Sequence, residues 1–169
     1  MRVYLVKANS DTRKMSKDLF PLVFNLETGD QVNYDKLARS ANGKPLPINN
    51  IYFNISHSGP YWCVAFSDSE CGIDIEINRQ LRAQLSKRIL FQSENLIDNN
   101  LLKNWVIKEA YAKMKSVGIG LNFSTVSLEQ IESECVVTDL SDDDYILYAV
   151  GSSAVTDITK LNWDGKHLV

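Results

Sequence analysis

The chain has 169 residues, of which 44% are hydrophobic, so it can build a substantial core in one domain or in two small lobes. Its net charge of −3 argues against a general binder of nucleic acids or anionic membranes. No apolar run approaches the ~20 residues of a membrane span, and the first residues lack a signal-peptide pattern. The three cysteines form no C-x-x-C pair, which favours a reducing compartment, so we expect a cytoplasmic protein.

The first part of the chain has the pattern of a strand followed by a helix. Residues 2–7 are rich in apolar, β-prone side chains, and they predict the strand. Residues 10–12 are candidates for the cap of the helix. Its apolar side chains recur at helical spacing: Met15, Leu19, Leu22 and Val23.

Three strands joined by short polar turns are predicted over residues 51–56, 61–66 and 71–77. We expect an antiparallel meander, which would bring His57 and the third strand into one sheet. A lone histidine is more often a structural hydrogen-bonding group than a functional one. However, His57 lies in a turn beside hydroxyls and Gly59, where N–H and O–H donors could receive an anion.

The third strand alternates apolar and acidic residues. Ile73, Ile75 and Ile77 therefore share one face, and Asp74 and Glu76 share the other. Two carboxylates about 7 Å apart at the backbone can close onto one hard cation. The alternative is an ordinary solvated face of a half-buried strand.

The strongest helical pattern covers residues 101–115. Glu109 and Lys113 fall within the stripe that also holds its apolar residues, and charges in such a stripe tend to mark a functional site. The alternative is an exposed i,i+4 ion pair worth a few tenths of a kcal/mol. A second, basic helix is predicted over residues 79–90, and it could receive an acidic partner.

The last third of the chain predicts strands at residues 123–128, 135–137 and 145–150. The acidic turn at residues 142–144 lacks EF-hand spacing, so we interpret it as solvated. Asp164 and Gly165 indicate a hairpin in the tail.

Three stretches, in this order, resemble the 4′-phosphopantetheinyl transferases of the surfactin-synthetase-activating type. The first is Phe53-Asn54-Ile55-Ser56-His57-Ser58-Gly59, and the second is Gly72-Ile73-Asp74-Ile75-Glu76. The third is Trp105-Val106-Ile107-Lys108-Glu109-Ala110-Tyr111-Ala112-Lys113, followed by Gly118-Ile119-Gly120-Leu121. The resemblance covers about residues 43–128.

The resemblance implies an α+β fold with antiparallel sheets, packed helices and two lobes related by a pseudo-twofold axis. Relative to larger members of that family, the first lobe is reduced. We expect this reduced lobe at residues 1–50 and a catalytic lobe at residues 51–169, together forming one compact unit. The oligomeric state is open between a monomer and a homodimer that covers the missing surface.

The resemblance also implies an Mg²⁺-dependent enzyme. It would transfer the phosphopantetheine arm of coenzyme A to a serine of an acyl or peptidyl carrier protein and release 3′,5′-ADP. By this resemblance Asp74, Glu76 and Glu109 bind Mg²⁺, and Glu109 also helps to deprotonate the serine. Lys113 neutralises the leaving phosphate.

The remaining site residues follow from the same resemblance and concern coenzyme A. Ser56 and His57 would hold its 3′-phosphate, Lys108 would contact phosphate, and Lys44 and Pro45 would lie in the adenine-side loop. No residue matches the family's basic segment for the 3′-phosphate, for which four basic residues are candidates: Arg13, Lys14, Lys17 and Arg39. Two other functions are open: a non-catalytic protein that binds coenzyme A or carriers, and a pyrophosphate hydrolase.

Overall fold

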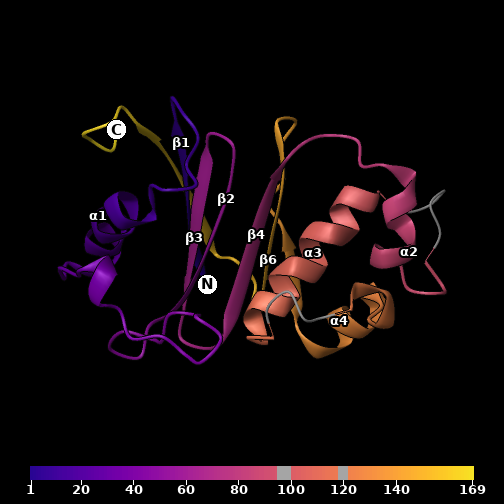
Figure 1. Ribbon diagram of the computed structural model, residues 1–169. Coiled ribbons are helices and arrows are strands. Elements are labelled where there is room, and N and C mark those ends of the chain that lie inside the picture. Colours follow the sequence, from indigo (N-terminus) through magenta and orange to yellow (C-terminus); the bar gives the residue numbers. More distant parts are fainter. Residues whose placement is uncertain (95–99, 118–121) are drawn as a thin grey trace.

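A computed structural model of the chain describes residues 1–94, 100–117 and 122–169. Two β-sheets pack face to face, and helices cover the outer face of each sheet, so the described part has four layers (Figure 1). The sheets are mostly antiparallel, which confirms the predicted α+β class with packed helices.

The first sheet has the strand order β2-β3-β1-β7. Its strands are β1 (Arg2–Ala8), β2 (Tyr52–Ser58), β3 (Tyr61–Ser67) and β7 (Asp157–Trp163). β3 pairs antiparallel with β2 on one side and with β1 on the other, and β7 runs parallel to β1. The hairpin predicted at Gly165 is confirmed, because Trp163 forms a bridge with Leu168 across the turn.

The second sheet has the order β4-β6-β5 and comprises β4 (Cys71–Ile77), β6 (Tyr145–Gly151) and β5 (Val136–Asp139). All three predicted strands of the meander therefore exist, but the expectation of a single sheet is wrong. β1 and β2 already occupy both edges of β3, so β4 crosses to the other sheet and pairs with β6.

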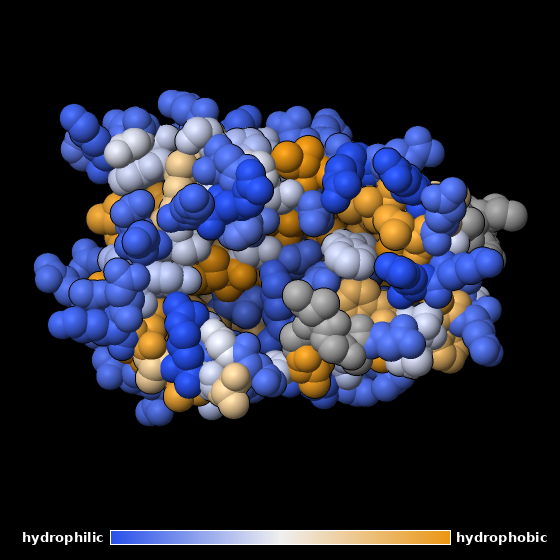
Figure 2. All heavy atoms as spheres, in the orientation of Figure 1, coloured by the Kyte–Doolittle hydropathy of each residue, from blue (hydrophilic) through white to orange (hydrophobic). Residues whose placement is uncertain are grey.

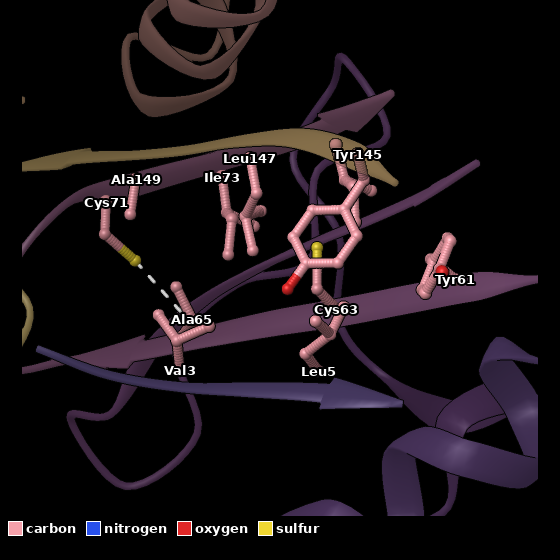
Figure 3. Packing of buried hydrophobic residues seen from close by; sticks show 11 residues of the cluster. Val3, Leu5, Tyr61, Cys63, Ala65, Cys71, Ile73, Tyr145, Leu147 and Ala149 are labelled. Atoms are coloured by element: carbon pink, nitrogen blue, oxygen red, sulfur yellow. Dashed lines mark hydrogen bonds between the residues drawn. The ribbon is translucent and has the colours of Figure 1, made fainter. Parts of the chain in front are cut away.

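The interior between the sheets is a compact apolar layer. Figure 3 shows its two rows, which face each other across the gap. One row comes from β1 and β3 and the other from β4 and β6: Val3, Leu5, Tyr61, Cys63, Ala65, then Cys71, Ile73, Ile75, Tyr145, Leu147, Ala149. Ile73 and Ile75 lie in this layer while Asp74 points to the other face of β4, as the alternation in the sequence predicts.

α1 (Ser16–Thr28) covers the outer face of the first sheet. Its inward side chains Leu19, Phe20, Val23 and Phe24 are buried. The expected cap at residues 10–12 is wrong. The Thr12 side chain instead donates to the carbonyls of Gly59 and Tyr61, so it fastens the chain to the β2–β3 turn.

The second sheet is covered by α3 (Leu101–Met114) and α4 (Leu128–Glu134). Two local predictions are wrong here. Residues 123–125 form a 3-10 turn followed by α4 instead of a strand, with Asn122 and Ser127 capping the two elements. The basic segment 79–90 has only a 3-10 turn (Ala83–Leu85) and one turn of helix, α2 (Ser86–Ile89).

The predicted lobe boundary at residue 50 does not separate the two sheets, because β1, which precedes it, pairs with β3 and β7, which both follow it. The division into residues 1–50 and 51–169 therefore stays a prediction.

Hydrophilic side chains cover most of the face seen in Figure 2, with hydrophobic ones in separate patches. Within the described residues, no helix is long and apolar enough to cross a membrane.

Candidate active site

The candidate site lies along the line where β2 and β4 run side by side. Each strand is the edge of its own sheet, so neither has a backbone partner on this side. Side chains of β2 fill the gap instead. The Asn54 Oδ1 accepts a hydrogen bond from the Ile73 amide (3.0 Å), and the Ser58 Oγ accepts one from the Ile77 amide (3.1 Å). This β2–β4 seam explains the polar alternation of β2, since every second residue faces β4.

Three predicted site residues meet at the centre of the seam. Ser56 Oγ donates to Asp74 Oδ1 (2.7 Å). Lys113 reaches across from α3, and its Nζ donates to the same Oδ1 (2.7 Å), to Ser56 Oγ (2.9 Å) and to the carbonyl of Ile73 (3.1 Å). The Asp74 side chain is only 9% exposed, while that of Lys113 is 27% exposed. The ion pair is therefore shielded on the Asp74 side and open to solvent on the Lys113 side.

Glu76 lies on the same face of β4, farther toward the end of the strand. Its Oε2 accepts a hydrogen bond from Ser58 Oγ (2.9 Å), and the Arg79 guanidinium lies 3.6 Å away. Glu76 is thus partly neutralised and remains partly exposed. Neither Ser58 nor Arg79 belongs to the predicted site.

Glu109 faces β4 from α3, one helical turn from Lys113. Burial raises the pKa of the Glu109 carboxyl, and the negative charges of Asp74 and Glu76 raise it further, whereas Lys113 lowers it. The three predicted metal ligands therefore interact electrostatically across the seam. A carboxylate with that surplus of negative charge nearby is stabilised by a cation.

The distance between α3 and β4 is set by Gly72. A Cβ atom at this position would lie 1.9 Å from the Ala110 carbonyl oxygen and 2.8 Å from the Met114 amide nitrogen. Only glycine permits this close approach of two backbones. Because Ala110 and Met114 flank Glu109 and Lys113 in the chain, the Gly72 contact also determines how near those side chains come to Asp74.

A cavity of about 340 Å³ opens beside the seam, between α1, β2 and the end of α3. It brings together four residues predicted to bind coenzyme A, namely Lys44, Pro45, His57 and Lys113. Of the four basic residues considered for the 3′-phosphate, Arg39 lines this cavity. Its guanidinium donates to the Gly43 carbonyl and stacks over the Tyr34 ring, which holds it at the cavity wall.

The loop that carries Lys44 is attached to the end of α3. Lys44 Nζ pairs with Glu70 (2.6 Å) and donates to the Met114 carbonyl (3.2 Å), while Asn42 donates to the Ser116 carbonyl (2.8 Å). These bonds satisfy carbonyls that a helix end leaves without partners. The cavity wall and the helix that bears Glu109 and Lys113 are therefore one connected unit.

Lys108 is placed elsewhere. Its side chain is fully buried on the far side of α3, and its Nζ donates to Glu94 (2.7 Å) and to the carbonyls of Ile89 (2.7 Å) and Phe123 (3.1 Å). An ammonium has three N–H donors, so none remains for a phosphate. This corrects the expected phosphate contact: Lys108 joins α3 to the segments around α2 and α4.

Within residues 1–94, 100–117 and 122–169, no group of three or more His, Cys, Asp or Glu side chains is already gathered as a metal site. Asp74 and Glu76 are instead paired with Lys113 and Arg79. The chemistry of the donor set nevertheless fits Mg²⁺, which prefers carboxylate oxygens. The assignment of Asp74, Glu76 and Glu109 to a metal stays a prediction.

The sequence indicated Ser56 only as a phosphate-binding residue, and it did not identify Asn54 and Ser58 as side chains that bridge the seam. Asn54, Ser56 and Ser58 alternate along β2, and this period of two was a usable signal. Glu94 gave no signal, because no local pattern links it to its partner Lys108, which lies 14 residues later in the chain. The Gly118-Ile119-Gly120-Leu121 stretch lies outside the described residues.

Comparison with known proteins places this site in context. The chain is similar to curated proteins named 4′-phosphopantetheinyl transferases. Psf-1 of Bacillus pumilus is 30% identical over 125 residues, which covers 60% of this chain and 54% of the relative. Sfp of Bacillus subtilis (strain 168) is 29% identical over 113 residues, covering 59% and 50%.

A human relative, L-aminoadipate-semialdehyde dehydrogenase-phosphopantetheinyl transferase, is 29% identical over 122 residues, covering 57% of this chain and 39% of the relative. The chain thus spans about half the length of the bacterial relatives. No protein-family model matches the chain.

Proposed function

We propose that this protein transfers the 4′-phosphopantetheine arm of coenzyme A to a serine of an acyl or peptidyl carrier protein, with Mg²⁺ as cofactor and 3′,5′-ADP as the other product. The observation that carries the proposal is the seam, where Lys113, Asp74 and Glu109 meet beside a cavity that also contains Lys44 and His57. Similarity to proteins named 4′-phosphopantetheinyl transferases supports the reaction class.

The cavity suits the nucleotide end of coenzyme A. Its volume falls within the usual range of roughly 300–1,000 Å³ for small-molecule sites, although toward the low end. Arg39, Lys44 and His57 supply cationic or hydrogen-bonding groups for the 3′-phosphate, and Tyr34 offers an aromatic face. Ser56 is buried and bonded to both Lys113 and Asp74, so its role would be to orient these two side chains.

Asp74, Glu76 and Glu109 would hold the Mg²⁺ ion. When bound, the ion would neutralise diphosphate charge as the bond to the leaving phosphate breaks. Lys113 approaches the same place from α3 and balances the charge of the departing 3′,5′-ADP. Glu109 would accept the proton of the carrier serine, directly or through a water molecule.

The test is to incubate the protein with coenzyme A, Mg²⁺ and a panel of apo carrier proteins of the fatty-acid and peptide-synthetase types, and to weigh each carrier by mass spectrometry. The expected result is a phosphopantetheine adduct on at least one carrier, lost when Mg²⁺ is chelated. Absence of an adduct on every carrier, with coenzyme A binding intact, would contradict the proposal.

A second candidate is a protein that binds coenzyme A or a carrier without transfer. The favouring observation is that Asp74 and Glu76 already have cationic partners within the chain. Tight coenzyme A binding that is unchanged in Asp74→Ala, together with no turnover, would support it. Release of 3′,5′-ADP without any carrier would instead indicate hydrolysis of the coenzyme A diphosphate.

A further inference from the structure

Lys113 has no free hydrogen-bond donor in this structure. Its three N–H groups are used by Asp74, Ser56 and the Ile73 carbonyl, at 2.7, 2.9 and 3.1 Å. An anion can therefore engage this ammonium only if one of these bonds is released. The hydrogen-bond donors that Lys113 would offer to a ligand are therefore already used by groups of the protein.

Asp74 is likewise already bonded within the protein. Its Oδ1 accepts from both Ser56 and Lys113, and the side chain is 9% exposed, so the pair interacts in a poorly solvated place. A divalent cation that approached Asp74 would meet the ammonium at close range, and two like charges a few ångströms apart repel strongly where water is scarce. A metal ion alone thus meets an Asp74 carboxylate that is already paired with a cation.

The position of Lys113 allows its ammonium to leave Asp74, so that it need not compete with a divalent cation for that carboxylate. Its side chain is 27% exposed and lines the cavity, whereas Asp74 is buried behind it. A rotation of the long lysine side chain toward the cavity would bring Nζ to a phosphate there without disturbing the apolar core. Ser56 would remain to donate its hydrogen bond to Asp74.

We infer that Lys113 acts as an exchangeable counter-ion of Asp74: a polyphosphate in the cavity draws Lys113 away, and a divalent cation then takes its place. The inference rests on the proposed function for the identity of the anion, the diphosphate of coenzyme A. Its consequence is that cation and coenzyme A each raise the affinity of the protein for the other, since such coupling is reciprocal.

Isothermal titration of Mg²⁺ into the protein, alone and with saturating coenzyme A but no carrier, measures this coupling. For the unaltered protein we expect weak Mg²⁺ binding alone and a gain of roughly 5- to 150-fold with coenzyme A, the usual range for coupled sites. In Lys113→Met, Mg²⁺ alone should bind several-fold more tightly than to the unaltered protein, although coenzyme A binds less tightly. The gain between the two titrations should shrink.

Two variants make the test specific. Lys115→Met removes the same charge from the end of α3, where Lys115 pairs with Glu134 (2.9 Å), and it should leave both titrations unchanged. Lys113→Arg keeps a cation beside Asp74 and should restore weak Mg²⁺ binding in the absence of coenzyme A. Circular dichroism of each variant checks the fold.

The inference is overturned if Mg²⁺ alone binds Lys113→Met no more tightly than the unaltered protein, or if the coupling to coenzyme A is the same in both. This outcome is separate from the carrier assay. Coupling without any adduct on a carrier would support the exchange and contradict transfer. An adduct with equal coupling in both proteins would support transfer and contradict the exchange.

Discussion

Two lysines of α3 make similar hydrogen bonds but differ in their access to solvent. Lys108 and Lys113 each donate three hydrogen bonds, one of them to a carboxylate at 2.7 Å. Lys108 is fully buried between α3 and its flanking segments, but Lys113 is 27% exposed and lines the cavity. Bond count and bond length are nearly equal, and the access of solvent differs.

The comparison teaches that a lysine whose three donors are all used is purely structural only where no ligand can reach its ammonium. A phosphate cannot reach Lys108, whereas at Lys113 it can arrive through the cavity. Under the proposed function, α3 therefore has a structural face, which contains Lys108, and a functional face, which contains Glu109 and Lys113. The predictions below break or sharpen this division between the two faces.

The largest effect is expected on the functional face. Glu109→Gln should lower carrier modification by roughly 10²–10⁴-fold, since a general base typically contributes that much. Stability should remain near that of the unaltered protein, because glutamine keeps the shape of the side chain and removes a charge whose burial raises the pKa of the Glu109 carboxyl. Mass-shift rates and urea unfolding measure the two quantities. Near-normal turnover would remove Glu109 from the mechanism.

Lys108→Met should act on stability. It leaves the Glu94 carboxylate buried without its cation, and removal of one partner of a buried pair costs about 3–5 kcal/mol. Urea unfolding checks the value. Lys113→Met is the matched control, and we expect a smaller loss because the Lys113 side chain is 27% exposed and Ser56 still donates a hydrogen bond to Asp74. Equal losses in the two variants would abolish the distinction between the faces.

The buried pair should also make the protein sensitive to acid. Burial alone would raise the pKa of the Glu94 carboxyl, but hydrogen bonds from Lys108 and from the amides of Phe91 and Leu128 hold it below its ordinary value. A lowered pKa contributes stability that is present above the ordinary glutamate pKa of about 4.3 and is lost as the pH falls through the folded value.

Glu94→Gln tests this sign. It should cost about 1.5–3 kcal/mol at neutral pH, the usual worth of a hydrogen bond to a charged group, and less at lower pH. Unfolding curves of both proteins across this range give the difference. A difference that grew toward acid pH would mean that Glu94 is destabilised by burial.

Gly72→Ala should move α3 away from β4 without changing the side chains of Glu109 and Lys113. The new methyl group would meet the backbone of α3, so we expect a loss of at least about 1–3 kcal/mol and slower transfer. Gly151→Ala is the control, since its methyl group would meet the flexible Met1 side chain. Equal effects of both substitutions on transfer rate would show that the spacing at Gly72 is unimportant.

The smallest effect is expected outside both faces, in the basic segment before α3. Arg82 and Arg88 are exposed, and reversing both to Glu should raise the KM for an acidic carrier several-fold, because surface charges mainly steer association. Added salt should reduce the difference. A KM independent of these charges would mean that the carrier docks elsewhere.

The sequence by itself determined the class of the fold and predicted the residues of the candidate site. Period-two alternation located β2 and β4, a short apolar run located β3, and helical spacing located α3 with Glu109 and Lys113 on one stripe. Such patterns are local, since they depend only on which side a residue faces within its own element. They therefore survive without knowledge of the neighbours.

Only the tertiary structure decided which elements became neighbours. It placed β4 in the second sheet, set Lys108 against Glu94, and brought Lys113 to Asp74 across the seam. These contacts join residues of different elements, and a lysine in the sequence gives no sign of which carboxylate it will meet. Whether a charge is buried or open to a ligand depends on the packing of whole layers, which no local pattern encodes.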